Sequence, residues 1–171
     1  MVRIIGTLLL LAGSSGIAYS YCNEQNERLK ILRVMREIFI RIKKEIEYLK
    51  ASIPEICLNL GEQNQTFSEV FKDIYQELEL NNGRSFNDIW HIHFTSALKK
   101  VPLKEAEKEM IKSFPESLIY RDSEGQAGGI EKYIGEISKY VDEIETVIKN
   151  KNKVIMCMGI MAGMITVVIL F

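Results

Sequence analysis

Charged residues are absent from two stretches of the chain, one near each end. Residues 4–21 and residues 154–171 contain no Asp, Glu, Lys or Arg over 18 positions each. A helix of that length is about 27 Å long, which is close to the roughly 30 Å hydrocarbon core of a bilayer. The pattern therefore predicts a transmembrane helix at each end, with a charged segment of residues 22–153 between them.

Long amphipathic helices are predicted next to both charge-free stretches. Apolar residues recur there at steps of three and four, as in a helix with one buried face. In the first helix, about residues 24–50, they are Leu29, Leu32, Met35, Phe39, Ile42, Ile46 and Leu49. In the last helix they are Ile130, Ile134, Ile137, Val141, Ile144 and Ile148. No proline separates either helix from its charge-free stretch, so we expect each to continue into a membrane span and the two to pack antiparallel.

Shorter helices are predicted between the two long ones from their start and stop signals. Capping-box patterns at residues 52–55 and 66–69 each start a helix, and Gly61 closes the first of them. Ser85 with Asp88 starts another. The expected short helices cover about residues 53–61, 67–80, 86–98 and 103–114. No strand pattern occurs, so the predicted fold is an all-α, membrane-anchored helical bundle whose two long antiparallel helices are continuous with the N- and C-terminal transmembrane helices.

Basic residues beside the two charge-free stretches predict which side of the membrane the bundle occupies. They are Arg28, Lys30, Arg33 and Arg36 after the first stretch, and Lys149, Lys151 and Lys153 before the second. By the positive-inside rule, residues 22–153 lie in the cytoplasm and both termini lie outside. The alternative is an exported protein, because Ala18-Tyr19-Ser20 resembles a signal-peptidase site after an apolar run.

Motifs for catalysis or cofactor binding are missing from the charged segment. Cys22, Cys57 and Cys157 do not have the spacing of a zinc site or a disulfide framework. His91 and His93 are two residues apart and point in different directions on a helix, so they do not chelate one metal. Residues 22–153 carry 21 basic and 23 acidic residues, a formal charge of −2, which disfavours nucleic-acid binding. We expect no catalytic residue, cofactor, metal or nucleic-acid partner.

Two groups of residues are candidates for contacts with other helices or proteins. Charged residues of the first long helix form either a solvated face or a docking surface for a partner; they are Glu37, Arg41, Lys44, Glu45 and Glu47. Small residues in the predicted spans permit close helix packing within one chain or in a homo-oligomer, or have no such role; they are Gly159, Gly163, Ala12 and Gly16.

Several landmarks, taken in order, resemble one known family. They are Arg28-Leu29, Glu45-Ile46-Glu47-Tyr48, Ile53-Pro54-Glu55, Phe71 to Leu80 with Gly83, Ser85-Phe86-Asn87-Asp88-Ile89-Trp90, Leu118 to Gln126, and Lys153 to Phe171. Their order and spacing are similar to the stage III sporulation protein AB family of endospore-forming bacteria, over essentially the whole chain. Ile119-Tyr120 stands where that family usually has Leu-Gly, so the shape of this turn is open.

The resemblance implies a membrane component of the sporulation channel complex between mother cell and forespore. It also implies that the helical domain is similar to the cytoplasmic domains of platform proteins in type II secretion and type IV pilus systems, which contact a hexameric ATPase. The leading hypothesis is thus a non-enzymatic platform protein in the cell membrane, with its bundle in the mother-cell cytoplasm. Its expected partners are a secretion-type ATPase subunit, other membrane components of the complex, and membrane lipid. The alternatives are an exported, C-terminally anchored helical adaptor or sensor with a cleaved signal peptide, and, remotely, a membrane-bound enzyme that uses His91 or His93.

Overall fold

The computed structural model describes residues 2–63, 66–80, 83–118 and 123–170, with the backbone but not every side chain near both ends. Its elements are α1 (Val2–Lys44), the π-helix η1 (Glu45–Leu49), α2 (Ile53–Gln63), α3 (Ser68–Glu79), α4 (Phe86–Leu98), α5 (Glu105–Lys112), the 3-10 helix η2 (Phe114–Leu118) and α6 (Ser123–Leu170). No strand occurs among these residues. The all-α prediction is confirmed.

The described chain divides into two compact units. One unit is residues 30–141 and holds the short helices; the other joins residues 1–29 to residues 142–171. Helix α1 is continuous from the second unit into the first, as the absence of a breaker predicted. A search of the described residues finds no helix with the length and apolarity that a membrane span requires. Many side chains of residues 4–21 and 154–171 lie outside the described residues, so the two spans stay predictions.

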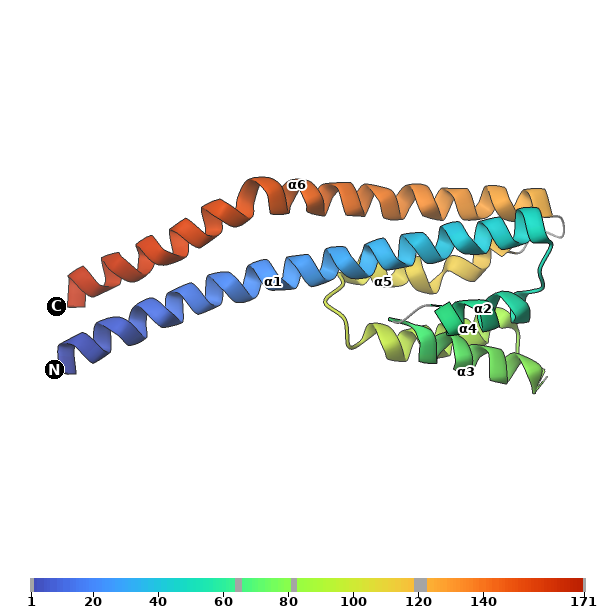
Figure 1. Ribbon diagram of the computed structural model, residues 1–171, viewed down its shortest axis with the longest axis horizontal. Coiled ribbons are helices and arrows are strands. Elements are labelled where there is room, and N and C mark those ends of the chain that lie inside the picture. The colour runs from blue at the N-terminus through green and yellow to red at the C-terminus, as the bar shows by residue number, and fades with distance from the viewer. Residues whose placement is uncertain (1, 64–65, 81–82, 119–122, 171) are drawn as a thin grey trace. The chain divides into compact units, whose positions relative to one another are not determined.

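Within the unit of residues 30–141, α1 and α6 run antiparallel (Figure 1). Lys43 pairs with Glu131, and Phe39 packs edge-on against Tyr133 with ring centroids 6.4 Å apart. Residue numbers fall along α1 as they rise along α6, which is the register of an antiparallel pair. The predicted packing of the two long helices is therefore confirmed in this unit.

An aromatic cluster joins five elements in the core of the same unit. Phe114 of η2 stacks on Phe39 of α1 at 4.2 Å and lies 5.3 Å from Trp90 of α4. Trp90 also meets Phe71 of α3, and Tyr133 of α6 meets Phe114 edge-on at 5.7 Å. The Trp90 indole N–H donates to the carbonyl oxygen of Ile111 at 3.0 Å, which satisfies its polar atom inside the core. These rings fix the short helices to the α1–α6 pair.

Local signals set some of the helix boundaries. Ser85 and Asp88 form a capping box at the start of α4, as predicted. Phe67, and not Thr66, is the N-cap residue of α3, and its side chain makes no capping hydrogen bond. Gly61 does not close α2, which continues to Gln63. A Cβ atom at Gly61 would lie 2.9 Å from the side chain of Lys72, so this glycine permits the close approach of α3.

Candidate docking surfaces

Three of the five residues predicted as a docking surface lie exposed on α1. They are Glu37, Arg41 and Lys44, and we call them the α1 docking face. Arg41 donates to the side-chain oxygen of Gln63 on α2 at 2.6 Å. Glu37 and Arg41 also line a hollow of about 100 Å³ beside Gln63. The face therefore extends from α1 onto the end of α2.

Glu45 differs from the prediction because its side chain is buried, with 8% of its surface exposed. Its carboxylate accepts a hydrogen bond from the side-chain amide of Asn59 at 3.1 Å. Helix α2 covers this side of η1 and supplies the polar partner that a buried carboxylate needs. Glu47, the fifth candidate, is half-buried. Glu45 therefore belongs to the packing between η1 and α2, and does not form part of an exposed docking surface.

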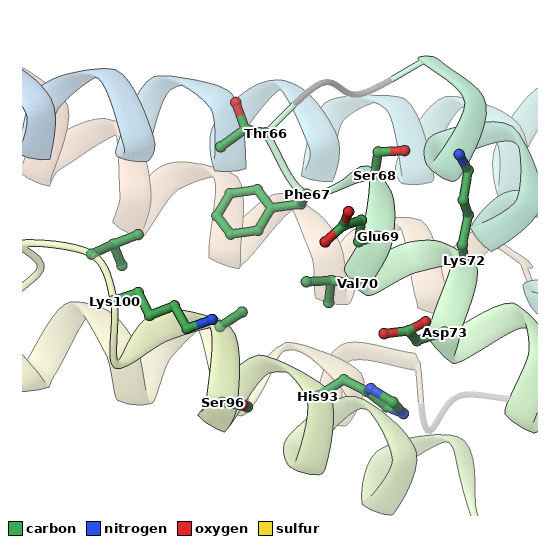
Figure 2. A pocket seen from close by; sticks show the side chains of 12 residues that line it. Thr66, Phe67, Ser68, Glu69, Val70, Lys72, Asp73, His93, Ser96 and Lys100 are labelled. Carbon is green, nitrogen blue, oxygen red and sulfur yellow. The ribbon is translucent and has the colours of Figure 1, made fainter.

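A larger groove, which the sequence pattern did not indicate, lies between the start of α3 and the end of α4. Its volume is about 720 Å³. Figure 2 shows Glu69 and Asp73 of α3 facing His93 of α4 and Lys100, which follows α4, across it. Phe67, which is 3% exposed and packs against Phe94, forms an apolar part of the wall. The lining mixes both signs of charge, so the groove has no simple preference for an anion or a cation.

His93 has a carboxylate partner on the neighbouring helix α3. Its Nε2 lies 2.8 Å from the carboxylate of Glu77, which also accepts from Arg84 at 2.6 Å. These hydrogen bonds, first from His93 and then from Arg84, hold the pKa of Glu77 below its ordinary value. Ser96 lies one turn from His93 on α4, but no hydrogen bond joins the two among the described residues. The arrangement ties α3 to α4 without an activated nucleophile.

Metal binding is not supported by the part of the chain that the structure describes. No group of three or more His, Cys, Asp or Glu side chains that could hold a metal ion is found there. His91 is exposed and lies 3.5 Å from the hydroxyl of its own-helix neighbour Thr95. Cys57 is buried beside Glu45, and burial raises its thiol pKa to about 12. A thiol with so high a pKa is a poor metal ligand or nucleophile.

The small residues predicted to pack in the spans are only partly described. The surroundings of Gly159, Gly163 and Ala12 lie outside the described residues. Gly16 is exposed, and a Cβ atom there would meet nothing within 4 Å in the part of the chain that the structure describes. Large apolar side chains are exposed on the described part of α6, and apart from the neighbours Met164 and Ile165 successive ones lie three or four residues apart; they are Val154, Met158, Met161, Met164 and Ile165. This stripe is suited to an apolar surrounding or a second helix.

Comparison with known proteins identifies the family. The model of the stage III sporulation protein AB family matches residues 3–171. The chain belongs to this family. A solved structure of stage III sporulation protein AB is 21% identical, covers 72% of this chain and 97% of its own length, and superposes with a TM-score of 0.64, which shows the same fold. No significant match was found among curated proteins. Family membership gives the chain a sporulation-related role and confirms the resemblance seen in its motifs.

Proposed function

We propose that the protein is a non-enzymatic platform component of the sporulation channel complex between mother cell and forespore. Its predicted spans, residues 4–21 and 154–171, anchor it in the cell membrane, and its bundle lies in the mother-cell cytoplasm. The α1 docking face and its extension on α2 bind a secretion-type ATPase subunit. Other membrane components of the complex contact the spans and the exposed apolar stripe of α6.

One observation carries this proposal: α1 is a single helix from Val2 to Lys44. The helix that contains the first charge-free stretch therefore also presents Glu37, Arg41 and Lys44 at its other end. Beyond residue 30 it is fixed to α6 by the Lys43–Glu131 ion pair and by the ring contact of Phe39 with Tyr133. A force or displacement at the docking face is thus transmitted along a packed helix towards the membrane, as a platform protein requires.

A platform protein needs no catalytic geometry, and two potentially reactive side chains in the described part of the chain have structural surroundings. His93 is held by Glu77, and the Cys57 thiol is buried with a raised pKa. The groove between α3 and α4 brings together charged side chains of both signs. Binding of a protein partner requires none of these groups to react.

Topology is tested by labelling an exposed cysteine introduced at Asn87, in the first turn of α4. Intact cells that produce the full chain are treated with a membrane-impermeant maleimide before and after lysis. We expect Asn87→Cys to react only after lysis. Reaction in intact cells would contradict the cytoplasmic placement and favour the exported adaptor.

Docking is tested by co-purification of the ATPase subunit with paired charge reversals. Arg41→Glu with Lys44→Glu changes the α1 docking face, and Lys132→Glu with Lys139→Glu makes the same change of charge at exposed positions of α6. We expect the first pair to abolish co-purification and the second to retain it. If only the α6 pair abolished co-purification, the docking site would lie on α6. If the ATPase subunit co-purified with each of the two variants, direct docking through either face would be contradicted.

A further inference from the structure

Two large apolar side chains are exposed next to each other just after the end of α1. Tyr48 is 73% exposed and Leu49 is 71% exposed, and both belong to the π-helix η1. Lys50 follows them and is exposed as well. We call these three residues the η1 tip. Single exposed apolar residues are common on protein surfaces, whereas an adjacent pair of this size marks a candidate contact with another molecule.

The exposure of Leu49 comes from the wide turn of η1. In a regular helix Leu49 would lie on the same side as Ile42 and Ile46, which are both buried. In η1 the backbone N–H of Lys50 instead donates to the carbonyl oxygen of Glu45, five residues earlier. A turn of this kind contains one more residue than an α-turn, so it carries Leu49 away from the buried side and out to solvent.

The backbone at the end of η1 is also unusual. Lys50 has a φ of 53°, in the left-handed region, and the chain then turns back into α2 (Figure 1). Among the described residues, no other residue except a glycine has a positive φ. A π-turn and a left-handed lysine are both locally unfavourable, and such geometry is concentrated at functional sites. Here the two together hold an apolar pair in solvent, which stabilises the chain only when a partner covers the pair.

The η1 tip adjoins the α1 docking face. Tyr48 and Leu49 come four and five residues after Lys44, and because the turn is wide both lie on the side of the helix that Lys44 occupies. Every exposed charged side chain in residues 41–50 is basic; they are Arg41, Lys44 and Lys50. The two acidic side chains of this range are buried or half-buried. The tip and the face therefore form one surface in which positive charge flanks an apolar pair.

We propose that the η1 tip inserts into an apolar pocket bordered by acidic side chains on the ATPase subunit, and that it anchors the contact made by the α1 docking face. This inference rests on the proposed function, because it names the feature of the partner that the docking face recognises. Tyrosine and arginine are enriched among the residues that dominate binding energy at interfaces. Acidic side chains at the edge of the pocket would complement Lys44 and Lys50.

A second copy of this chain is a poorer occupant of the tip. The two apolar side chains offer on the order of 300 Å², whereas a stable dimer needs about 800 Å² on each partner. Two tips facing each other would also bring the same basic side chains together, which disfavours the pair. A different protein that follows α1 gains the further area of the docking face, including the hollow of about 100 Å³ beside Gln63.

The test is the affinity of the full chain in detergent for the purified ATPase subunit, measured by biolayer interferometry. We expect Leu49→Ala to weaken binding about tenfold, and Tyr48→Ala with Leu49→Ala to weaken it about a hundredfold. The matched control is Leu80→Ala with Ile92→Ala, which truncates side chains that are 69% and 49% exposed elsewhere in the same unit. It should bind like the wild type. Because all four side chains are exposed, urea unfolding followed at Trp90 should be unchanged in both double variants.

The acidic border is tested by Lys44→Gln with Lys50→Gln. This variant should bind severalfold more weakly than the wild type at low salt, and the difference should disappear at about 0.5 M salt, where the charges are screened. An affinity equal to that of the wild type at low salt would overturn the acidic border.

The outcomes separate this inference from the proposed function. If the wild-type chain did not bind the ATPase subunit, the docking proposal would fail and this inference with it. If Arg41→Glu with Lys44→Glu abolished binding while Tyr48→Ala with Leu49→Ala did not weaken it, the η1 tip alone would be overturned. Equal weakening by the control pair would contradict the assignment to the tip. If truncating the tip abolished self-association in sedimentation velocity and left ATPase binding intact, a second copy would occupy the tip, which also overturns the inference.

Discussion

Gly129 of α6 tests how closely the last long helix packs on the chain segment before it. A Cβ atom at this position would lie 2.5 Å from the carbonyl oxygen of Ser117 and 3.2 Å from its Cα. Both are backbone atoms of η2, so no side-chain rotation relieves the clash. On either side of Gly129, Gln126 donates to the Leu118 carbonyl at 3.2 Å and the Tyr133 hydroxyl donates to the Ser113 carbonyl at 2.8 Å. The substitution Gly129→Ala therefore forces α6 away from η2 against these bonds.

The magnitude follows from two opposing terms. Alanine in place of glycine inside a helix stabilises by about 0.8–1 kcal/mol. Overpacking against fixed backbone costs about 1–3 kcal/mol. At Gly128 and Gly135 a Cβ atom would meet nothing within 4 Å, so only the first term applies there. We expect Gly129→Ala to lower the free energy of unfolding by up to about 2 kcal/mol, and Gly128→Ala and Gly135→Ala to raise it by up to about 1 kcal/mol.

Urea unfolding followed by tryptophan fluorescence measures this difference. Trp90 is the only tryptophan in the chain, is fully buried, and lies 5.3 Å from the ring of Phe114 in η2. The signal therefore reports on the packing that Gly129→Ala disturbs, with the full chain in detergent. If Gly129→Ala proves as stable as Gly128→Ala, α6 does not approach η2 as closely as described, and the explanation of this glycine is wrong.

Three further predictions concern local contacts. Ser85→Ala removes the capping hydrogen bond of α4 and should cost about 1 kcal/mol in urea unfolding; no change would contradict the cap. Hydrogen bonds from His93 and Arg84 depress the folded-state pKa of Glu77. They therefore add to the free energy of unfolding above about pH 4.5, and this stabilisation is lost as the pH falls below that value. Glu77→Gln should flatten the acid side of the stability–pH profile, and an unchanged profile would refute the linkage. Burial raises the Cys57 pKa to about 12, so at pH 8 maleimide should modify Cys57 only in urea, and rapid labelling of the native protein would refute its burial.

Elements with a strong local signal could be predicted from the sequence. The Ser85 capping box set the start of α4, and the three- and four-residue spacing of Phe39 and its neighbours identified the buried face of α1. Gly61 was misread because glycine ends helices and also permits close packing, and only the approach of Lys72 of α3 to Gly61 decides between these uses. The groove between α3 and α4 had no signal at all, since its lining comes from two separate segments, residues 66–73 and 93–101.

Glu45 was wrongly placed on the docking surface because it is charged, although the helical spacing puts it on the buried face. A 3.6-residue period puts Leu49 on the buried face with Ile46, yet Leu49 is 71% exposed and Glu45 is 8% exposed. Glu45 comes seven residues after Ile38 and three after Ile42, which are both buried, so a regular helix already turns it towards the core. The π-helix η1 accounts only for Leu49, because hydrogen bonds to the fifth residue widen the turn and shift later positions around the helix axis. The sequence does not show that the buried carboxylate has a partner, because Asn59, which donates to it, comes from α2. Charge alone therefore does not identify an exposed position on a helix, and the exposed candidates Glu37, Arg41 and Lys44 are the residues to test.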